Sequence, residues 1–139
     1  MKYHKINSIY KRDMTKPHVP FLLGEWAEPE FGYLQNNQWE FTEKIDGTNI
    51  RIMFDGGNIV FKGKTDNAQI PSRLIDKLQN LFLSRKTELK EIFKSGGEPV
   101  NVCLYGEGFG HKIQGKAGTD YLSTEVDLCL FDVRVGNWW

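Results

Sequence analysis

A lysine, an aspartate and a glycine lie close together in the segment 43–49, which reads EKIDGTN. An amine is a nucleophile only when it is neutral, and an ordinary lysine amine, with a pKa of ~10.4, is almost wholly protonated at neutral pH. Partial burial and neighbouring cations both favour the neutral form. Lys44 follows two aromatic residues, and the strands after it carry the basic side chains Arg51, Lys62 and Lys64. Lys44 is therefore a candidate nucleophile, near a glycine that would let a phosphate approach the backbone.

The same segment also has a simpler interpretation as a turn. Asp46-Gly47 is an ordinary turn signal, and taken alone it favours an exposed connection between two strands. Thr48 and Asn49, which follow it, offer a hydroxyl and an amide that would suit a ribose or a phosphate oxygen. The choice between the two interpretations depends on whether other parts of the chain point to the same ligand.

Three further stretches do point to a nucleotide. The stretch FKGKTDN places Lys62 and Lys64 on one strand face, which suits a polyphosphate, although exposed strand lysines often serve only solubility. In YGEGFG, the Glu107 carboxylate would accept hydrogen bonds from ribose hydroxyls, and the alternative is an ordinary surface glutamate. In LFDVRV, Phe131 would stack on a base and Asp132 would bind a metal-bound water. The alternative there is a core phenylalanine beside an aspartate in a turn.

The elements that would position these residues follow from the hydrophobic pattern. Alternating apolar residues predict strands over 39–45, 50–54, 58–64, 100–110 and 126–135. The tetrapeptide DGGN at 55–58 predicts a hairpin turn. Ile50, Ile52 and Phe54 point to one face of their strand, which is expected to be core. Both faces of 126–135 carry apolar residues, so this strand is expected to be central in its sheet.

One long helix is expected between these strands. Ser72 is its predicted N-cap, Gly96-Gly97 is its predicted stop, and its leucines and phenylalanines recur at helical spacing. Its apolar stripe should pack on a sheet. Residues 1–38 hold scattered prolines and aromatics and are expected to form an irregular lead-in with short strands. Strands, a helix and a return to strands indicate the α+β class with largely antiparallel sheets.

Composition excludes several classes of protein. The 139 residues fit one domain, and the 18 basic and 18 acidic side chains balance, so any nucleic acid must be held by a local basic patch. No stretch has the length and apolarity of a signal peptide or a membrane helix, so a cytoplasmic location is expected. Cys103 and Cys129 lie in apolar strands and indicate buried thiols more than a disulfide. The histidines lack the spacing of metal ligands.

With these stretches in order, the sequence resembles the covalent nucleotidyltransferases, and among them the ATP-dependent RNA ligases of the bacteriophage type. EKIDGTN resembles the family's lysine motif KxDG, FKGKTD its next strand, YGEGFG its glutamate motif and LFDVRV its aromatic-aspartate motif. One KxDG is a weak signal, whereas four motifs in the family's order are a strong one. The resemblance implies antiparallel sheets that flank an ATP pocket, as in nucleotidyltransferase or ATP-grasp-like folds.

The resemblance also implies a reaction in three steps. Lys44 attacks the α-phosphate of ATP to give lysyl-AMP and pyrophosphate, AMP passes to a 5′-phosphate, and a 3′-hydroxyl displaces it to seal the strand. The implied cofactors are ATP and Mg²⁺, and the implied partners are strand ends of RNA, or of DNA. The implied nucleotide-binding residues are Glu43, Asp46, Gly47, Asn49, Lys64, Glu107, Phe131 and Asp132. Lys64 stands where the family usually has an arginine.

Roles for the implied nucleotide-binding residues follow from the same motifs. Glu43 would contact the adenine, Asn49 would help to hold the phosphates, and Glu107 would hold the ribose. Phe131 would stack on the adenine, with Asp132 beside it.

The family has two later motifs, a second glutamate motif and a closing Lys-x-Lys, downstream of the aromatic-aspartate strand. This chain ends at Trp139 with neither, so residues 1–139 are expected to be the amino-terminal part of an adenylyltransferase domain, as a truncated form or half of a split enzyme. A capping-type guanylyltransferase and a non-catalytic remnant that binds nucleic acid stay open as alternatives. The uncovered last strand would also allow pairing with a second copy.

Overall fold

The computed structural model describes residues 3–114 and 120–139. These residues divide into two compact units, which are described separately. The sheet unit contains Tyr3 and residues 44–139, and the lead-in unit contains residues 4–43. Most of the expected lead-in, 1–38, falls in the second unit. No helix in the described part of the chain is long and apolar enough to cross a membrane.

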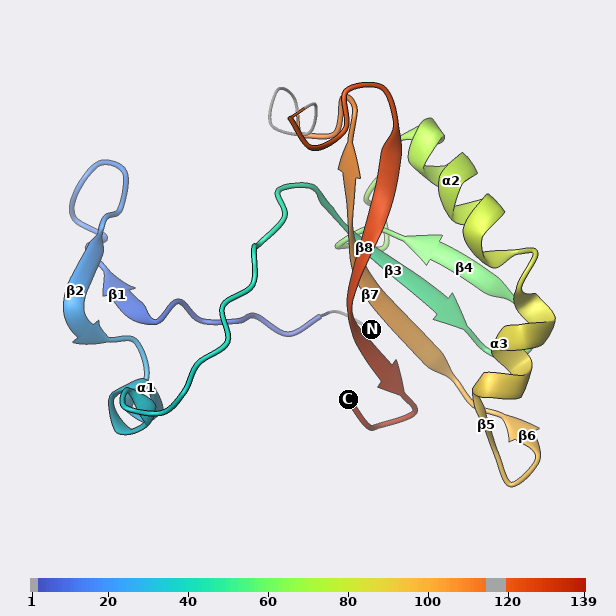
Figure 1. Cartoon of the computed structure of the whole chain (residues 1–139), viewed down its shortest axis with the longest axis horizontal. Coiled ribbons are helices and arrows are strands. Elements are labelled where there is room, and N and C mark those ends of the chain that lie inside the picture. Colours follow the sequence, from blue (N-terminus) through green and yellow to red (C-terminus); the bar gives the residue numbers. More distant parts are fainter. Residues whose placement is uncertain (1–2, 115–119) are drawn as a thin grey trace. The chain divides into compact units, whose positions relative to one another are not determined.

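The sheet unit is built on a four-stranded sheet with the order β4-β3-β7-β8, in which every neighbouring pair is antiparallel. The strands are β3 (Thr48–Phe54), β4 (Ile59–Lys62), β7 (Val102–Gly110) and β8 (Val126–Val135). Figure 1 shows their arrangement. The prediction of a mixed fold with antiparallel sheets is confirmed. The prediction that 126–135 is central is wrong, because β8 forms an edge of the described sheet and β3 and β7 occupy its centre.

The turn between β3 and β4 is a hairpin, as the tetrapeptide at 55–58 predicted. The Asp55 carboxylate accepts hydrogen bonds from the backbone N–H groups of Gly57, at 2.9 Å, and Asn58, at 2.6 Å. Gly56 has a φ of +80°, a value that favours glycine. The hairpin therefore fixes the register of the two strands from local sequence alone.

Two helices stand where one long helix was predicted, α2 (Ser72–Phe82) and α3 (Lys86–Ile92). The chain leaves helical geometry between them: the Arg85 N–H bonds the Phe82 carbonyl, three residues back, at 3.2 Å. Ser84 adds a competing contact, because its hydroxyl donates to the Asn80 carbonyl at 3.2 Å. Ser72 is the first helical residue and not the N-cap, since Pro71 precedes the helix without a side-chain cap.

The glycine pair that was predicted to end the long helix has another role. Gly96 and Gly97, with φ values of +61° and +88°, form the turn of a small hairpin. This hairpin joins β5 (Lys94–Ser95) to β6 (Glu98–Pro99). Two consecutive left-handed residues match the twist of short antiparallel strands, which is why the pair serves a hairpin as readily as a helix end.

The core of the sheet unit lies between one face of the sheet and α2, which runs beside the sheet in Figure 1. Its fully buried members include Ile50 and Ile52 of β3 and Leu74 and Leu78 of α2. The alternation that predicted a core face of β3 is therefore confirmed. Full burial of each such side chain stabilises the fold by about 1.5–3 kcal/mol relative to exposure.

The lead-in unit contains a pair of antiparallel strands, β1 (Tyr10–Arg12) and β2 (Phe21–Trp26), followed by a short helix, α1 (Pro29–Leu34). The Tyr10 and Trp26 rings stack with their centroids 5.0 Å apart. Trp39 donates its indole N–H to the Leu34 carbonyl at 3.0 Å. Across residues 4–43, all of which are described, no side chain is buried.

Candidate nucleotide site

Glu107 lies at the centre of the candidate site, half-buried near the end of β7. Antiparallel pairing places Asn49 of β3 directly opposite it. The backbone N–H of Gly47, just before β3, donates a hydrogen bond to the Glu107 carboxylate. The sheet therefore joins the lysine motif and the glutamate motif, which are about sixty residues apart in sequence, through one strand pair.

Three charged side chains act electrostatically on this carboxylate. Burial raises the pKa of Glu107 above its ordinary value of 4.5, Lys44 and Lys64 oppose that rise, and Asp46 adds to it. Lys44 and Lys64 are themselves exposed. The charges of Lys44, Asp46 and Lys64 thus all act on the Glu107 carboxylate, while the shared nucleotide site predicted for these residues stays a prediction. The partial burial that was expected for Lys44 is wrong.

Gly47 is buried where the lysine motif turns against β7. A Cβ at this position would lie 2.3 Å from the carbonyl oxygen of Gly108 and 3.0 Å from the Cγ of Glu107. Real side chains do not approach a backbone atom this closely, so either β7 or the turn would have to move. The glycine is therefore required for the close approach of this segment to β7, which brings its N–H to the Glu107 carboxylate.

Tyr121 is a site residue that sequence reasoning missed. Its phenol oxygen accepts a hydrogen bond from the Asp46 N–H at 3.3 Å, and its ring packs edge-to-face on Phe109 with centroids 5.7 Å apart. An isolated tyrosine after a glycine-rich loop carries no motif or periodicity that would have found it. The sequence also offers the lysine-bearing loop before it, 111–116, as a candidate contact for a nucleic-acid strand, and the last two residues of this loop lie outside the described part of the chain.

A bulge in β8 determines where the aromatic-aspartate motif faces. Tyr105 of β7 pairs with Asp132, and Gly106 pairs with Leu130. Phe131, between them, is therefore the extra residue of the bulge and is paired with no residue of β7. A bulge lets two successive side chains point to nearly the same side of a sheet. Phe131 and Asp132 therefore share the Tyr105 side.

Tyr3 confirms which face this is. Its ring lies 5.0 Å from Tyr105 and 5.3 Å from Phe131, measured between centroids, and its hydroxyl donates to the Asp132 carboxylate at 3.0 Å. Tyr105 and Glu107 are two residues apart in β7, so their side chains leave the same face of the sheet. The aromatic-aspartate motif and the glutamate motif thus lie on one face, on neighbouring strands.

Two predicted features stand apart from this arrangement. Glu43 is the last residue of the lead-in unit, and its contact with the adenine stays a prediction. In the described chain, no group of three or more histidine, cysteine, aspartate or glutamate residues is placed to hold a metal ion, and the involvement of Mg²⁺ stays a prediction.

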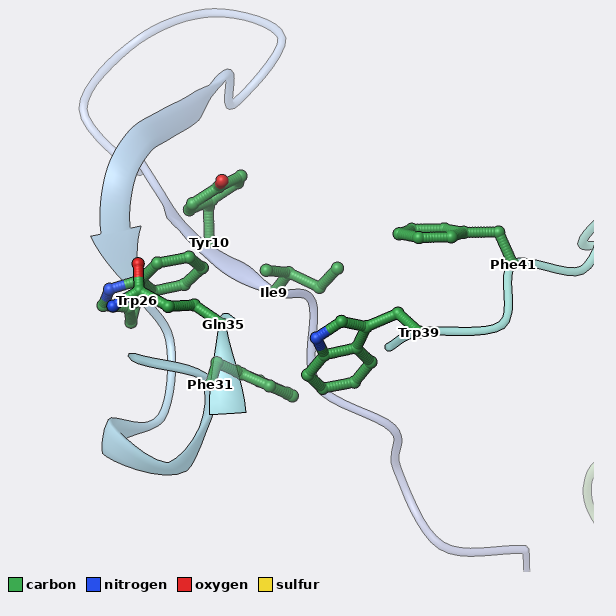
Figure 2. Close-up of a pocket in the computed structure, with 7 residues that line it drawn as sticks. All are labelled: Ile9, Tyr10, Trp26, Phe31, Gln35, Trp39 and Phe41. Atoms are coloured by element: carbon green, nitrogen blue, oxygen red, sulfur yellow. The ribbon is translucent and has the colours of Figure 1, made fainter. Parts of the chain in front are cut away.

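A separate hollow of about 150 Å³ lies in the lead-in unit. It is lined by Ile9, Tyr10, Trp26, Phe31, Gln35, Trp39 and Phe41. Figure 2 shows the aromatic rings around the hollow and Gln35, which contributes a side-chain amide to its lining. None of the predicted site residues lines this hollow, so it is distinct from the nucleotide site.

A comparison with protein-family models finds a match to the family described as RNA ligase, over residues 37–139. The match covers every predicted site residue and leaves out β1, β2 and α1. Searches of curated proteins and of solved structures found no significant match to the chain.

Proposed function

The chain belongs to the RNA ligase family, and on this premise we propose that it transfers the adenylyl group of ATP through Lys44. The observation that carries the proposal is the group of side chains around Glu107, where two exposed lysines meet a half-buried carboxylate. Lysines supply a nucleophile and a phosphate ligand, and a carboxylate supplies an acceptor for ribose hydroxyls.

In the proposed first step, the neutral amine of Lys44 attacks the α-phosphorus of ATP. A phosphorus–nitrogen bond forms, the bond to the bridging oxygen breaks, pyrophosphate leaves and the amine loses a proton. The AMP then passes to a 5′-phosphate at a strand end, which frees Lys44, and a 3′-hydroxyl displaces AMP to seal the strand. Lys44 is exposed, so an incoming triphosphate can reach its amine without a change in the fold.

The remaining residues divide between the two ends of the nucleotide. Lys64 would neutralise charge on the departing phosphates, which is usually a large part of catalysis of phosphoryl transfer. Asn49 would donate its amide to a phosphate oxygen, while Glu107 would accept hydrogen bonds from the ribose. Asn49 and Glu107 are paired in the β3–β7 ladder, and Lys64 follows β4, the other neighbour of β3.

The adenine would lie toward β8. Phe131 is 47% exposed, which leaves a ring surface for stacking, and Asp132 stands beside it on the same face. Glu43 would contact the edge of the base. In the proposed arrangement, the base would lie beside β8, the ribose beside Glu107 of β7 and the phosphates beside the lysine motif.

Magnesium would reach this site with ATP. Mg²⁺ is commonly held by one or two carboxylates together with the phosphates of the nucleotide, and Asp46 and Glu107 are carboxylates of this kind. The ion would supply neutralisation of phosphate charge. The side chains present therefore fit a metal that is shared with the substrate better than a cage made by the protein.

An intact-mass measurement tests the proposal. The purified chain is incubated with Mg²⁺ and either ATP or GTP, beside Lys44→Ala and the control Lys90→Ala, which removes a lysine from α3. Gain of one AMP by the wild type and the control, but not by Lys44→Ala, is the expected result. A preference for GTP would support a capping-type guanylyltransferase instead. No adduct on a folded chain that binds ATP would support a non-catalytic remnant.

Pairing with a second copy is a subsidiary part of the proposal. At the β8 edge, Leu130 and Val133 are 49% and 37% exposed, and an edge strand offers unpaired backbone groups to another strand. We expect antiparallel pairing along this edge. A single monomeric species in light scattering at high protein concentration would contradict it.

A further inference from the structure

Arg51 is the only buried charged side chain among the described residues, with 1% of its surface exposed. It lies in the middle of β3, a central strand, on the face opposite the core. A buried guanidinium is costly unless its N–H groups are hydrogen-bonded. Two of them are: Nε donates to the Gly63 carbonyl at 2.8 Å, and Nη2 donates to Asp66 Oδ1 at 2.9 Å.

Both acceptors belong to the turn 63–66, which follows β4 and carries Lys64. Gly63 is buried, and a Cβ built on it would lie 3.7 Å from the carbonyl oxygen of Asn49. Asn49 in turn stands opposite Glu107. The guanidinium therefore ties this turn to β3 next to the strand pair that holds the candidate site.

We propose that Arg51 is a positioning residue, which fixes the turn 63–66 so that the Lys64 ammonium is held beside Glu107. The proposal rests on the proposed function, since it takes Lys64 as a phosphate ligand. A lysine side chain alone is flexible and loses considerable rotamer entropy when it binds. A fixed turn removes the backbone part of that cost and keeps the ammonium close to where the phosphates would lie.

The alternative is that Arg51 only stabilises the sheet. Asp66 separates the two roles, because its side chain is 67% exposed and its removal opens no cavity in the core. Asp66 also forms an ion pair with Lys62, whose Nζ lies 3.4 Å from Asp66 Oδ1. Asp66→Ala leaves Arg51 its hydrogen bond to the Gly63 carbonyl, so the chain should fold with a lower stability while the turn is loosened. Asp76→Ala on α2 is a matched control for the loss of an exposed aspartate.

The first arm of the test is a double-mutant cycle on lysyl-AMP formation. We expect Asp66→Ala to lower kcat/KM for ATP by roughly tenfold or more, as misplacement of a binding group does. In the Lys64→Ala background the same change should have little further effect, because it acts through a group that is already absent. Equal losses in both backgrounds would overturn the proposal, since a purely structural role is additive.

The second arm needs no activity: it follows the Glu107 side-chain carboxyl by NMR as the pH is varied. Loss of the negative Asp66 charge alone would lower the pKa of Glu107, whereas loss of the nearby Lys64 ammonium would raise it. The proposal predicts a rise in Asp66→Ala, approaching that in Lys64→Ala, and no change in Asp76→Ala. A fall, or no change, in Asp66→Ala would overturn it. A wild type that forms no lysyl-AMP would refute the proposed function, and this arm would still decide the role of Arg51.

Discussion

The two compact units differ in how far they bury their apolar side chains. In the sheet unit, Ile50, Ile52, Leu74 and Leu78 are at most 1% exposed, and they fix the positions of the strands that carry the site. In the lead-in unit, Phe41 is 82% exposed, and no residue from 4 to 43 is buried. About forty residues are near the lower limit for a chain that stabilises itself by its own core. The candidate site is thus built where burial holds side chains in place.

Removal of a core side chain should give the largest difference between the units. Leu78→Ala in α2 is expected to lower the free energy of unfolding by about 2–5 kcal/mol, from lost burial plus the cavity left behind. Phe41→Ala should change it by less than about 0.5 kcal/mol. Urea titration followed by circular dichroism measures both. Equal effects would show that the lead-in unit contributes a core of its own.

Glycine substitutions sharpen the comparison at the site. Gly47→Ala would bring a Cβ to 2.3 Å from the Gly108 carbonyl oxygen, so we expect a loss of about 1–3 kcal/mol in stability and loss of AMP transfer. Gly32→Ala in α1 would meet the partly buried Trp26 ring at 2.9 Å, and a side chain can move aside more easily than the Gly108 backbone can. Alanine also favours a helix, so Gly32→Ala should be neutral or stabilising by up to about 1 kcal/mol. A tolerated Gly47→Ala in both assays would contradict this description of the turn.

The half-buried carboxylate of the sheet unit should give a pH dependence. Because burial raises the pKa of Glu107 above 4.5, the folded chain keeps this proton at pH values where the unfolded chain has lost it. Stability therefore falls as the pH rises from the unfolded value through the raised folded value. Glu107→Gln should remove that fall. The measurement is the difference in unfolding free energy between the two proteins at several pH values, and a flat difference would contradict the prediction.

The smallest expected effect is at Tyr121. Tyr121→Phe removes the acceptor for the Asp46 N–H and keeps the ring against Phe109, so we expect a loss of about 0.5–1.5 kcal/mol in stability. Tyr10→Phe in the lead-in unit keeps the stack on Trp26 and should have no measurable effect. Urea titration of both variants provides the comparison, and AMP transfer by Tyr121→Phe should slow. Identical behaviour of the two variants would show that the Asp46 contact contributes nothing.

Features with local causes were predictable from the sequence. The alternation in β3 and the turn at 55–58 depend on neighbouring residues only, and both are confirmed. The grouping of Lys44, Lys64 and Glu107 at one nucleotide site was predicted from the order of their motifs, and it stays a prediction. The break between α2 and α3 was not, since the apolar spacing continues across Ser84 while the backbone does not.

Features that depend on residues far apart in the sequence could not be predicted, for a different reason. The burial of Arg51 depends on a turn that packs over it, and the Tyr121 contact joins residues 75 positions apart. The position of β8 at the edge of the described sheet depends on the sheet topology. The apolar residues on both faces of this strand had predicted a central position instead. In each case the deciding neighbour is set by the topology and not by the residue itself.

The bulge at Phe131 means that β8 contains one residue more than its pairing with β7 uses. Deletion of a residue inside a strand normally turns every later side chain over, from solvent to core or the reverse. Deletion of Phe131 would instead join Leu130 to Asp132 in uninterrupted register with Gly106 and Tyr105. The sheet can therefore give up this residue without changing which way its neighbours face, and the requirement for Phe131 is separable from the requirement to fold.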